Sequence, residues 1–148
     1  MNERIFELTE PLPHYVEPIK KLLAQLSSSH IEFGEKELRA IVESPASQLF
    51  ILEYDGQIAG MLTLCSYLAP TGRKLWIEDV VVDNAFRGRG YGRRLVEWAV
   101  DRAKEKGGTL MLTSKPSRVA ANALYRSAGF QPKETNVYRI SFPVEECE

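Results

Sequence analysis

The stretch from Ile77 to Leu95 constrains the fold of this chain more than any other segment. It begins as a valine-rich strand, passes through a turn that contains Gly88, Gly90 and Gly92, and continues into an amphipathic helix. The N–H groups of such a turn, and those of the first helical turn after it, have no partner within the helix and can converge on one anion. The stretch therefore predicts a phosphate-binding site between a strand and a helix.

Two common nucleotide-binding motifs do not fit this turn. The dinucleotide pattern G-x-G-x-x-G requires a third glycine where Arg93 stands, and it expects an acidic residue at the end of the next strand. A Walker A loop requires Lys followed by Ser or Thr after its last glycine, and that pair is absent. What remains is a turn with its own phosphate-pairing guanidinium groups, from Arg87, Arg89, Arg93 and Arg94. A solvated basic loop is the simpler alternative.

Hydrophobic periodicity predicts the order of the other elements. Helices are expected at Tyr15 to Leu26, Glu35 to Val42, Gly90 to Gly107, and Arg118 to Ala128 with Ser117 as its N-cap. Strands are expected at Arg4 to Leu8, Gln48 to Tyr54, Gln57 to Tyr67, Lys74 to Val82, Thr109 to Thr113 and Val137 to Phe142. Asp55-Gly56 is a strong hairpin signal between the second and third strands. This order predicts an α/β (α+β) fold in which one mixed, mostly antiparallel sheet carries helices on both faces.

Length and composition limit the possible classes of protein. With 148 residues the chain is expected to form one domain, 1–148. A net charge of −1 argues against nucleic acid as a partner, and the absence of a long apolar run argues against a membrane span. The two cysteines, Cys65 and Cys147, have neither metal-ligand spacing nor a disulfide framework, which favours a reducing cytoplasm and no metal.

Two motifs make the sequence resemble one known family. Arg87-Gly88-Arg89-Gly90-Tyr91-Gly92 is similar to the R/Q-x-x-G-x-G/A motif of the GCN5-related N-acetyltransferases, which bind acetyl-coenzyme A. The run from Asn122 to Phe130, NALYRSAGF, is similar to a second motif of that family and follows at the expected distance. The resemblance implies that the protein is an enzyme that transfers acetyl directly from acetyl-coenzyme A to a primary amine of a small molecule or peptide.

The resemblance also implies roles for particular residues. The diphosphate would lie on the backbone of the glycine turn, and the pantetheine arm would run along the preceding strand and near the later helix. The implied cofactor-binding residues are Val80, Val81, Val82, Arg87, Gly88, Arg89, Gly90, Tyr91, Gly92, Asn122 and Tyr125. The simpler alternative for the three valines is a buried strand.

Two groups are candidates for acid–base catalysis. An alkylammonium, whose reference pKa is about 10.4, must lose a proton before it attacks, and a carboxylate can accept that proton. We favour Glu78 over Asp79 because family members place a glutamate base on this strand, although a structural ion pair is nearly as good an interpretation. Tyr125 occupies the family's position for the acid that protonates the leaving thiolate, whereas its alternative is a core tyrosine with a surface hydroxyl.

The acceptor cannot be identified from the sequence. In the family it is shaped by the loop between the first two helices, here about 27–34, by the third strand and by the C-terminal segment. Dimers are frequent in the family, which leaves a homodimer open. A coenzyme A-binding sensor or interaction module without turnover is the alternative function, and it would need the glycine turn but neither Glu78 nor Tyr125.

Overall fold

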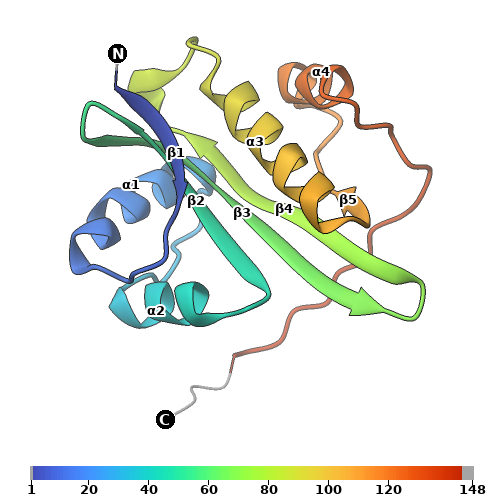
Figure 1. Cartoon of the computed structure of the whole chain (residues 1–148), viewed down its shortest axis with the longest axis horizontal. Helices are drawn as coiled ribbons and strands as arrows, with labels where there is room; N and C mark the ends of the chain where they lie inside the picture. Colours follow the sequence, from blue (N-terminus) through green and yellow to red (C-terminus); the bar gives the residue numbers. More distant parts are fainter. Residues whose placement is uncertain (1, 145–148) are drawn as a thin grey trace.

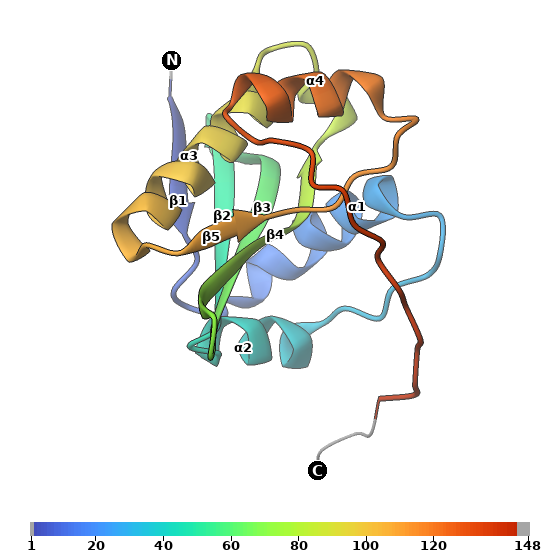
Figure 2. The same cartoon turned by 90° about the vertical axis from the view of Figure 1, so that its right-hand side faces the viewer.

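The computed structural model describes residues 2–144, which form one five-stranded sheet with helices on both faces (Figures 1 and 2). The strands are β1 (Glu3–Glu7), β2 (Ser47–Tyr54), β3 (Gln57–Ala69), β4 (Gly72–Val82) and β5 (Thr109–Met111). The helices are α1 (Val16–Leu26), α2 (Glu35–Glu43), α3 (Tyr91–Lys106) and α4 (Val119–Ser127), with short 3-10 turns η1 (Pro13–Tyr15) and η2 (Asn84–Phe86).

The strands lie in the order of the sequence, β1-β2-β3-β4-β5. Each neighbouring pair is antiparallel except β4 and β5, which are parallel. This arrangement confirms the predicted mixed, mostly antiparallel sheet. The hairpin between β2 and β3 turns at Asp55 and Gly56, both at positive φ (48° and 80°), as its Asp-Gly sequence predicts.

Each face of the sheet has its own hydrophobic core. On one face, Leu95 and Ala99 of α3 pack against Leu62 and Leu64 of β3. On the other face, Ile19 and Leu22 of α1 and Leu38 of α2 pack against β2, β3 and β4. Figure 2 shows the sheet edge-on, with α3 on one side and α1 on the other. The strands are apolar on both faces because both faces are covered.

A bulge interrupts the alternation of β4. The register with β3 shifts between Met61 and Thr63, and Asp79 has a φ of 53°. Before the bulge, Ile77 faces α3; after it, Val81 faces α1, while Val80 and Val82 pack on the α3 side. The extra residue therefore reverses which face each later side chain of β4 occupies.

Two sequence predictions about the C-terminal part are wrong. Residues 137–142 do not form a strand: every side chain from 131 to 144 is exposed, and the segment has no strand partner among the described residues. The alternation of apolar residues there predicted a half-buried strand, but a strand also needs a neighbour to pair with. Ser117 is not the N-cap of α4, because the helix begins one residue later, after Arg118.

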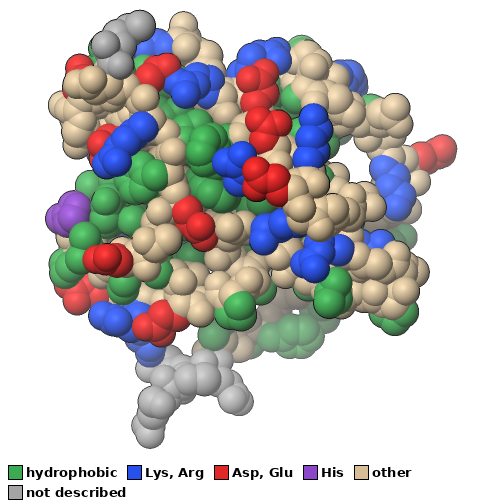
Figure 3. All heavy atoms as spheres, in the orientation of Figure 1, with side chains coloured by type: hydrophobic (Ala, Val, Ile, Leu, Met, Phe, Trp, Pro, Cys, Tyr) green, Lys and Arg blue, Asp and Glu red, His purple; other side chains and the backbone are tan. Residues whose placement is uncertain are grey.

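The described part of the chain contains one of the two cysteines. Cys65 is a free thiol, whereas Cys147 lies outside the described residues. Within residues 2–144, no helix has the length and apolarity to cross a bilayer. The same part of the chain contains no group of three His, Cys, Asp or Glu side chains arranged to hold a metal ion. On the face shown in Figure 3, acidic and basic side chains are interspersed.

Candidate active site

The glycine turn leads from the end of β4 into α3. Gly88 and Gly90 have φ values of 80° and 79°, a backbone conformation that favours glycine. The first hydrogen bond of α3 runs from the Arg94 N–H to the Gly90 carbonyl at 3.1 Å. The N–H groups of Tyr91, Gly92 and Arg93 therefore precede the helical hydrogen bonds and have no helical partner. A Cβ added at Gly90 would meet nothing within 4 Å, so the space beside this turn is open.

A cavity of about 900 Å³ begins at this turn and extends along β4. It lies where β4 and β5 separate, because their pairing stops at Trp76 and Met111. The last three residues of β4 therefore present a backbone edge with no partner strand on the β5 side. The lining residues are Gln25 and Leu26 of α1; Val80, Val81 and Val82 of β4; Arg87; Gly92 and Val96 of α3; Thr113, Ser114 and Lys115 after β5; Arg118, Ala121, Leu124 and Tyr125 at α4; and Val137.

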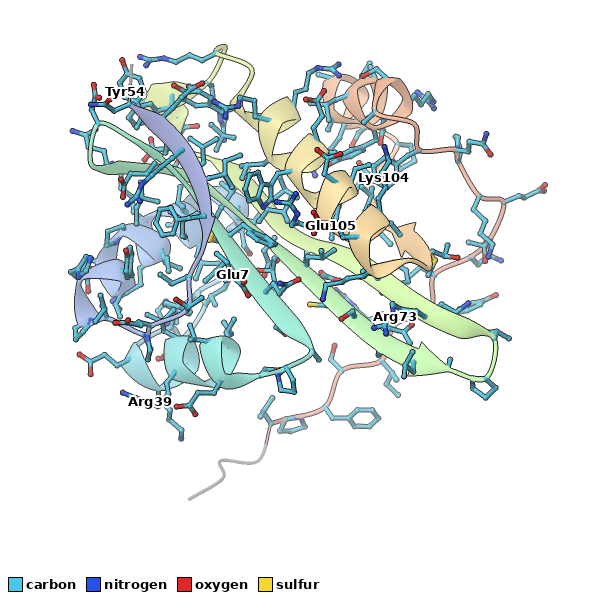
Figure 4. All side chains as sticks on the ribbon, viewed as in Figure 1. Glu7, Arg39, Tyr54, Arg73, Lys104 and Glu105 are labelled. Carbon is cyan, nitrogen blue, oxygen red and sulfur yellow. The ribbon has the colours of Figure 1, made fainter. Side chains whose placement is uncertain are left out.

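The arginines of the turn differ in their surroundings. Arg87 lines the cavity, and its Nε donates a hydrogen bond to the Val82 carbonyl at 3.3 Å. Arg89 instead lies over the rings of Tyr54 and Phe86, 5.5 and 5.2 Å from their centroids. Tyr54 is labelled in Figure 4, at the end of the sheet beside the turn. Arg87 is thus the guanidinium of the turn that is placed to meet a ligand in the cavity.

The next two arginines, on the first turn of α3, are engaged with other parts of the protein. Arg93 donates to Ser127 at 2.6 Å and pairs with Glu97, while Arg94 pairs with Glu3 of β1. These contacts hold α3 against α4 and β1. The ring of Tyr91 is buried, so only its backbone N–H is available at the turn.

Of the two α4 residues that the resemblance implies, Tyr125 lines the cavity and Asn122 does not. Tyr125 lines the cavity, and its ring packs edge-on against Phe130 at 6.1 Å. Asn122 is not among the lining residues; its Nδ2 donates to the Lys115 carbonyl at 3.0 Å. Asn122 therefore ties α4 to the loop after β5, and that loop carries the lining residues 113–115.

The two carboxylates of β4 lie beside the bulge. Glu78 pairs in register with Thr63, and Trp76 with Cys65, so Glu78 and Trp76 share the face that α1 and α2 cover elsewhere. Burial raises the pKa of both Glu78 and Asp79, and the neighbouring charge of Asp79 raises the pKa of Glu78 further. Neither carboxylate forms a salt bridge within residues 2–144. A carboxylate with a raised pKa is a better proton acceptor than an ordinary one.

Comparison with known proteins identifies the family of the chain. Residues 10–130 match the model of the acetyltransferase (GNAT) family. The chain belongs to that family. This confirms the resemblance drawn from the glycine turn and from the run that begins at Asn122.

Three relatives illustrate the match. N-alpha-acetyltransferase RimI of Mycobacterium tuberculosis is 46% identical over 67 residues, which are 44% of this chain and 41% of that protein. The match thus spans about two fifths of the length of that relative. Glucosamine 6-phosphate N-acetyltransferase of Arabidopsis thaliana is 28% identical over 109 residues, covering 70% of this chain and 73% of that one. A putative acetyltransferase from Agrobacterium tumefaciens superposes with a TM-score of 0.79 at 25% identity, covering 95% and 100% of the two chains.

All three relatives are described as acetyltransferases, so the comparisons do not favour the alternative of a coenzyme A-binding module without turnover. The prediction of a GNAT-type enzyme is confirmed at the level of the family.

The GNAT-family motifs do not cover every residue of the site. Gln25, at the end of α1, lines the cavity although sequence reasoning gave it no role. Ser114 also lines the cavity, and its buried Oγ has no hydrogen-bond partner in the described part of the chain. Ser114 follows a strand of only three residues, and nothing in its local sequence distinguishes it from an ordinary loop serine.

A group of side chains next to Glu78 forms a polar and aromatic surface on the α1 face. Trp76 Nε1 donates to the Tyr67 hydroxyl at 3.3 Å, and the Cys65 Sγ lies 3.8 Å from the Ser47 Oγ. Burial raises the pKa of the Cys65 thiol, and the charges of Glu78 and Asp79 add to that effect. The thiol is thus kept neutral. Glu78 and Trp76 are not among the residues that line the cavity, which begins two residues after Glu78, at Val80.

Proposed function

We propose that the protein transfers the acetyl group of acetyl-coenzyme A directly to a primary amine. The observation that carries this proposal is the cavity itself. It joins a glycine turn with free N–H groups, an unpaired strand edge at Val80–Val82 and the Tyr125 side chain. An extended molecule fits these features in that order: its anionic end would meet the N–H groups of the turn, and its amide groups would meet the free edge of β4.

The residues of the cavity fit such a molecule. The diphosphate would be held by the backbone at Gly88–Gly92 together with Arg87, where the positive end of the α3 dipole also favours negative charge. The amides of the pantetheine arm would pair with the free edge of β4, as an added strand does. The unpartnered Ser114 Oγ supplies a further hydrogen-bonding group on the wall of the cavity. Acetyl-coenzyme A supplies the thioester from which the acetyl group leaves.

Two side chains act as general base and general acid in this proposal. Glu78 accepts the proton that the acceptor ammonium loses, either directly or through water, and the neutral amine forms the new C–N bond. As the C–S bond breaks, the Tyr125 hydroxyl donates its proton to the sulfur, and the nitrogen, now bonded to the acetyl carbon, gives up its excess proton to the tyrosinate through water, which leaves a neutral amide and a thiol. A positioned acid or base of this kind contributes about 10²–10⁴-fold to the rate. Asp79 remains the alternative base, because it lies beside Glu78 and also has a raised pKa.

The class of acceptor is a primary amine on a small molecule or a peptide. The names of the relatives include an α-amine acceptor and an amino-sugar phosphate. The surface next to Glu78, with Tyr67, Trp76 and the two unpaired carboxylates, supports an acceptor that brings its own positive charge.

The first experiment is thermal unfolding with and without acetyl-coenzyme A. At 100 times the dissociation constant, binding adds about 2.7 kcal/mol to the free energy of unfolding, which appears as a higher Tm. Release of the coenzyme A thiol is then measured with a panel of amines that includes peptides with a free N-terminus, amino sugars, amino-sugar phosphates, polyamines and aminoglycosides. No change in Tm at millimolar acetyl-coenzyme A would refute the proposal. Binding without thiol release by any amine of the panel would contradict catalysis.

A further inference from the structure

Two side chains of α1 contact the point where the chain leaves β4. The Lys21 Nζ lies 3.3 Å from the Asp83 Oδ2, and the Asn84 N–H donates to the Gln25 Oε1 at 2.7 Å. Lys21 and Gln25 are four residues apart, so they lie on the same face of α1. We call these two contacts the α1 latch.

The latch completes the hydrogen bonding of the segment that leads into the glycine turn. The Asp83 N–H donates to the Ala59 carbonyl at 2.8 Å, and the Ala85 N–H donates to the Asp83 Oδ1 at 2.9 Å. The Phe86 N–H donates to the Asp83 carbonyl at 2.8 Å. The Asn84 N–H is the one donor at residues 83–86 that bonds to a side chain of a helix. Asn84 lies at the surface, so without Gln25 this N–H would bond to water, and the segment would lose its hydrogen bond to α1.

The two contacts of the latch differ in strength. Lys21 is 70% exposed, and an exposed ammonium contributes little to an ion pair. Asp83, in contrast, is buried, and its pKa is lowered mainly by the hydrogen bond from the Ala85 N–H, with Lys21 and Gln25 adding to the effect. Gln25 is half-buried and forms a short hydrogen bond, so it is the more important member of the latch.

Gln25 also connects two parts of the candidate active site. Its side chain lines the large cavity together with Arg87, which follows directly after η2. Gln25 is also the residue before the last residue of α1, Leu26, and the connection to α2 begins directly after it, at Ser27. One side chain therefore contacts the segment before the glycine turn, the cavity wall and the end of the helix that leads into residues 27–34.

From this arrangement we infer that Gln25, supported by Lys21, is a positioning residue that couples the glycine turn to the α1–α2 connection. Coenzyme A held at the turn restrains residues 83–87, and the latch passes that restraint to the end of α1 and to residues 27–34. Because coupling of this kind is reciprocal, ordering of residues 27–34 also strengthens coenzyme A binding. The inference rests on the proposed function, since it assumes that the cavity binds coenzyme A.

The test compares three forms of the full chain with coenzyme A as the ligand. Gln25→Met keeps most of the side-chain volume but removes the acceptor for the Asn84 N–H. Lys20→Ala, on the exposed side of the same helix, is the matched control, because the one ion pair of Lys20 within residues 2–144 is with Glu17 on the surface. Calorimetry gives the dissociation constant, and amide hydrogen exchange with mass spectrometry gives the protection of residues 27–34 with and without coenzyme A.

In the wild type and in Lys20→Ala, coenzyme A is expected to bind equally well and to slow exchange at residues 27–34. In Gln25→Met, the dissociation constant is expected to rise about two- to tenfold, the range that one hydrogen bond supports. The added protection of residues 27–34 is expected to be largely lost, while protection at the glycine turn remains.

Three results have distinct meanings. If the wild type does not bind coenzyme A, the proposed function fails and the inference fails with it. If the wild type binds and Gln25→Met has the same dissociation constant, the latch does not position the turn. If Gln25→Met binds more weakly but protects residues 27–34 as the wild type does, the coupling is refuted even though the turn is affected.

Discussion

Replacement of Glu78 by glutamine gives the sharpest test of the proposed chemistry. The carboxylate lies beside the bulge of β4, and burial together with the charge of Asp79 raises its pKa above the ordinary value of about 4.3. Glutamine keeps the size and shape of the side chain but cannot accept a proton. A positioned base contributes about 10²–10⁴-fold, which is about 2.7–5.4 kcal/mol of the activation free energy at 1.36 kcal/mol per factor of ten. Glu78→Gln is expected to lower kcat by that factor.

The pH dependence of wild-type activity follows from the direction of the pKa shift. Below the raised pKa, Glu78 is protonated and cannot act as a base, so kcat/KM falls as the pH is lowered through that value. The lower edge of the pH–rate profile should therefore lie above the ordinary range of a glutamate. The same edge should be missing from the profile of Glu78→Gln.

Stability is expected to change in the opposite sense to activity. A carboxyl whose folded-state pKa is raised stabilises the fold below its unfolded pKa, and that contribution is lost as the pH rises through the folded value. Near neutral pH, wild-type Glu78 is charged next to Asp79, and because Glu78 is exposed to solvent, the penalty that glutamine removes is small. Glu78→Gln should be at least as stable as the wild type at neutral pH, and the difference should vanish in acid.

The assay measures thiol release from acetyl-coenzyme A across a range of pH, with Tm measured in the same buffers. Asp79→Asn is the matched control, because it removes the neighbouring carboxylate. If Glu78→Gln retained wild-type kcat and the same lower edge of the profile, the assignment of the base would be wrong. If Asp79→Asn alone lost that edge, the base would be Asp79.

Three further changes test other parts of the site. Tyr125→Phe removes the proposed acid but leaves the ring against Phe130, so kcat should fall while the dissociation constant of coenzyme A stays nearly unchanged; equal turnover would exclude the acid role. Gly90→Val places a branched side chain at a φ of 79° beside the cavity and should abolish coenzyme A binding. Both this change and its control, Gly56→Val at a φ of 80° in the β2–β3 hairpin, should lower the free energy of unfolding by about 1–2 kcal/mol, but Gly56→Val should leave binding intact. An equal loss of binding in both variants would refute a local role for Gly90. Ser114→Ala removes a buried hydroxyl without a partner, so it should weaken coenzyme A binding without lowering the Tm of the free protein; unchanged affinity would show that Ser114 Oγ does not bind the ligand.

The sequence predicted the features that depend on local pattern. The Asp55-Gly56 hairpin, the helix after Gly90 and the strand before it all follow from spacing and turn chemistry that the chain carries locally. The family also followed from local runs of residues, and the match over residues 10–130 confirms it.

Features that depend on distant partners were not predictable in the same way. The alternation of residues 137–142 resembles that of a strand, yet no neighbouring strand pairs with it in the described part of the chain. The four arginines of the glycine turn looked equivalent in sequence, but Arg89, Arg93 and Arg94 contact residues from β1, β2, η2 and α4 as well as α3. The role of Gln25 depends on Asn84, which is 59 residues away.

The bulge at Asp79 explains why the site forms at this part of β4. On one side, pairing with β5 stops at Trp76; on the other, pairing with β3 is interrupted between Thr63 and Met61. The two interruptions overlap at Asp79 and Val80, so the backbone of these two residues lacks regular strand partners on both sides. Buried backbone groups need hydrogen bonds, and a ligand with amides along its length can provide them. Because of the bulge, Glu78 shares the α1 face with Val81, whereas Val80 and Val82 lie on the α3 face, so one extra residue puts the proposed base on the same face as the middle residue of the proposed binding edge.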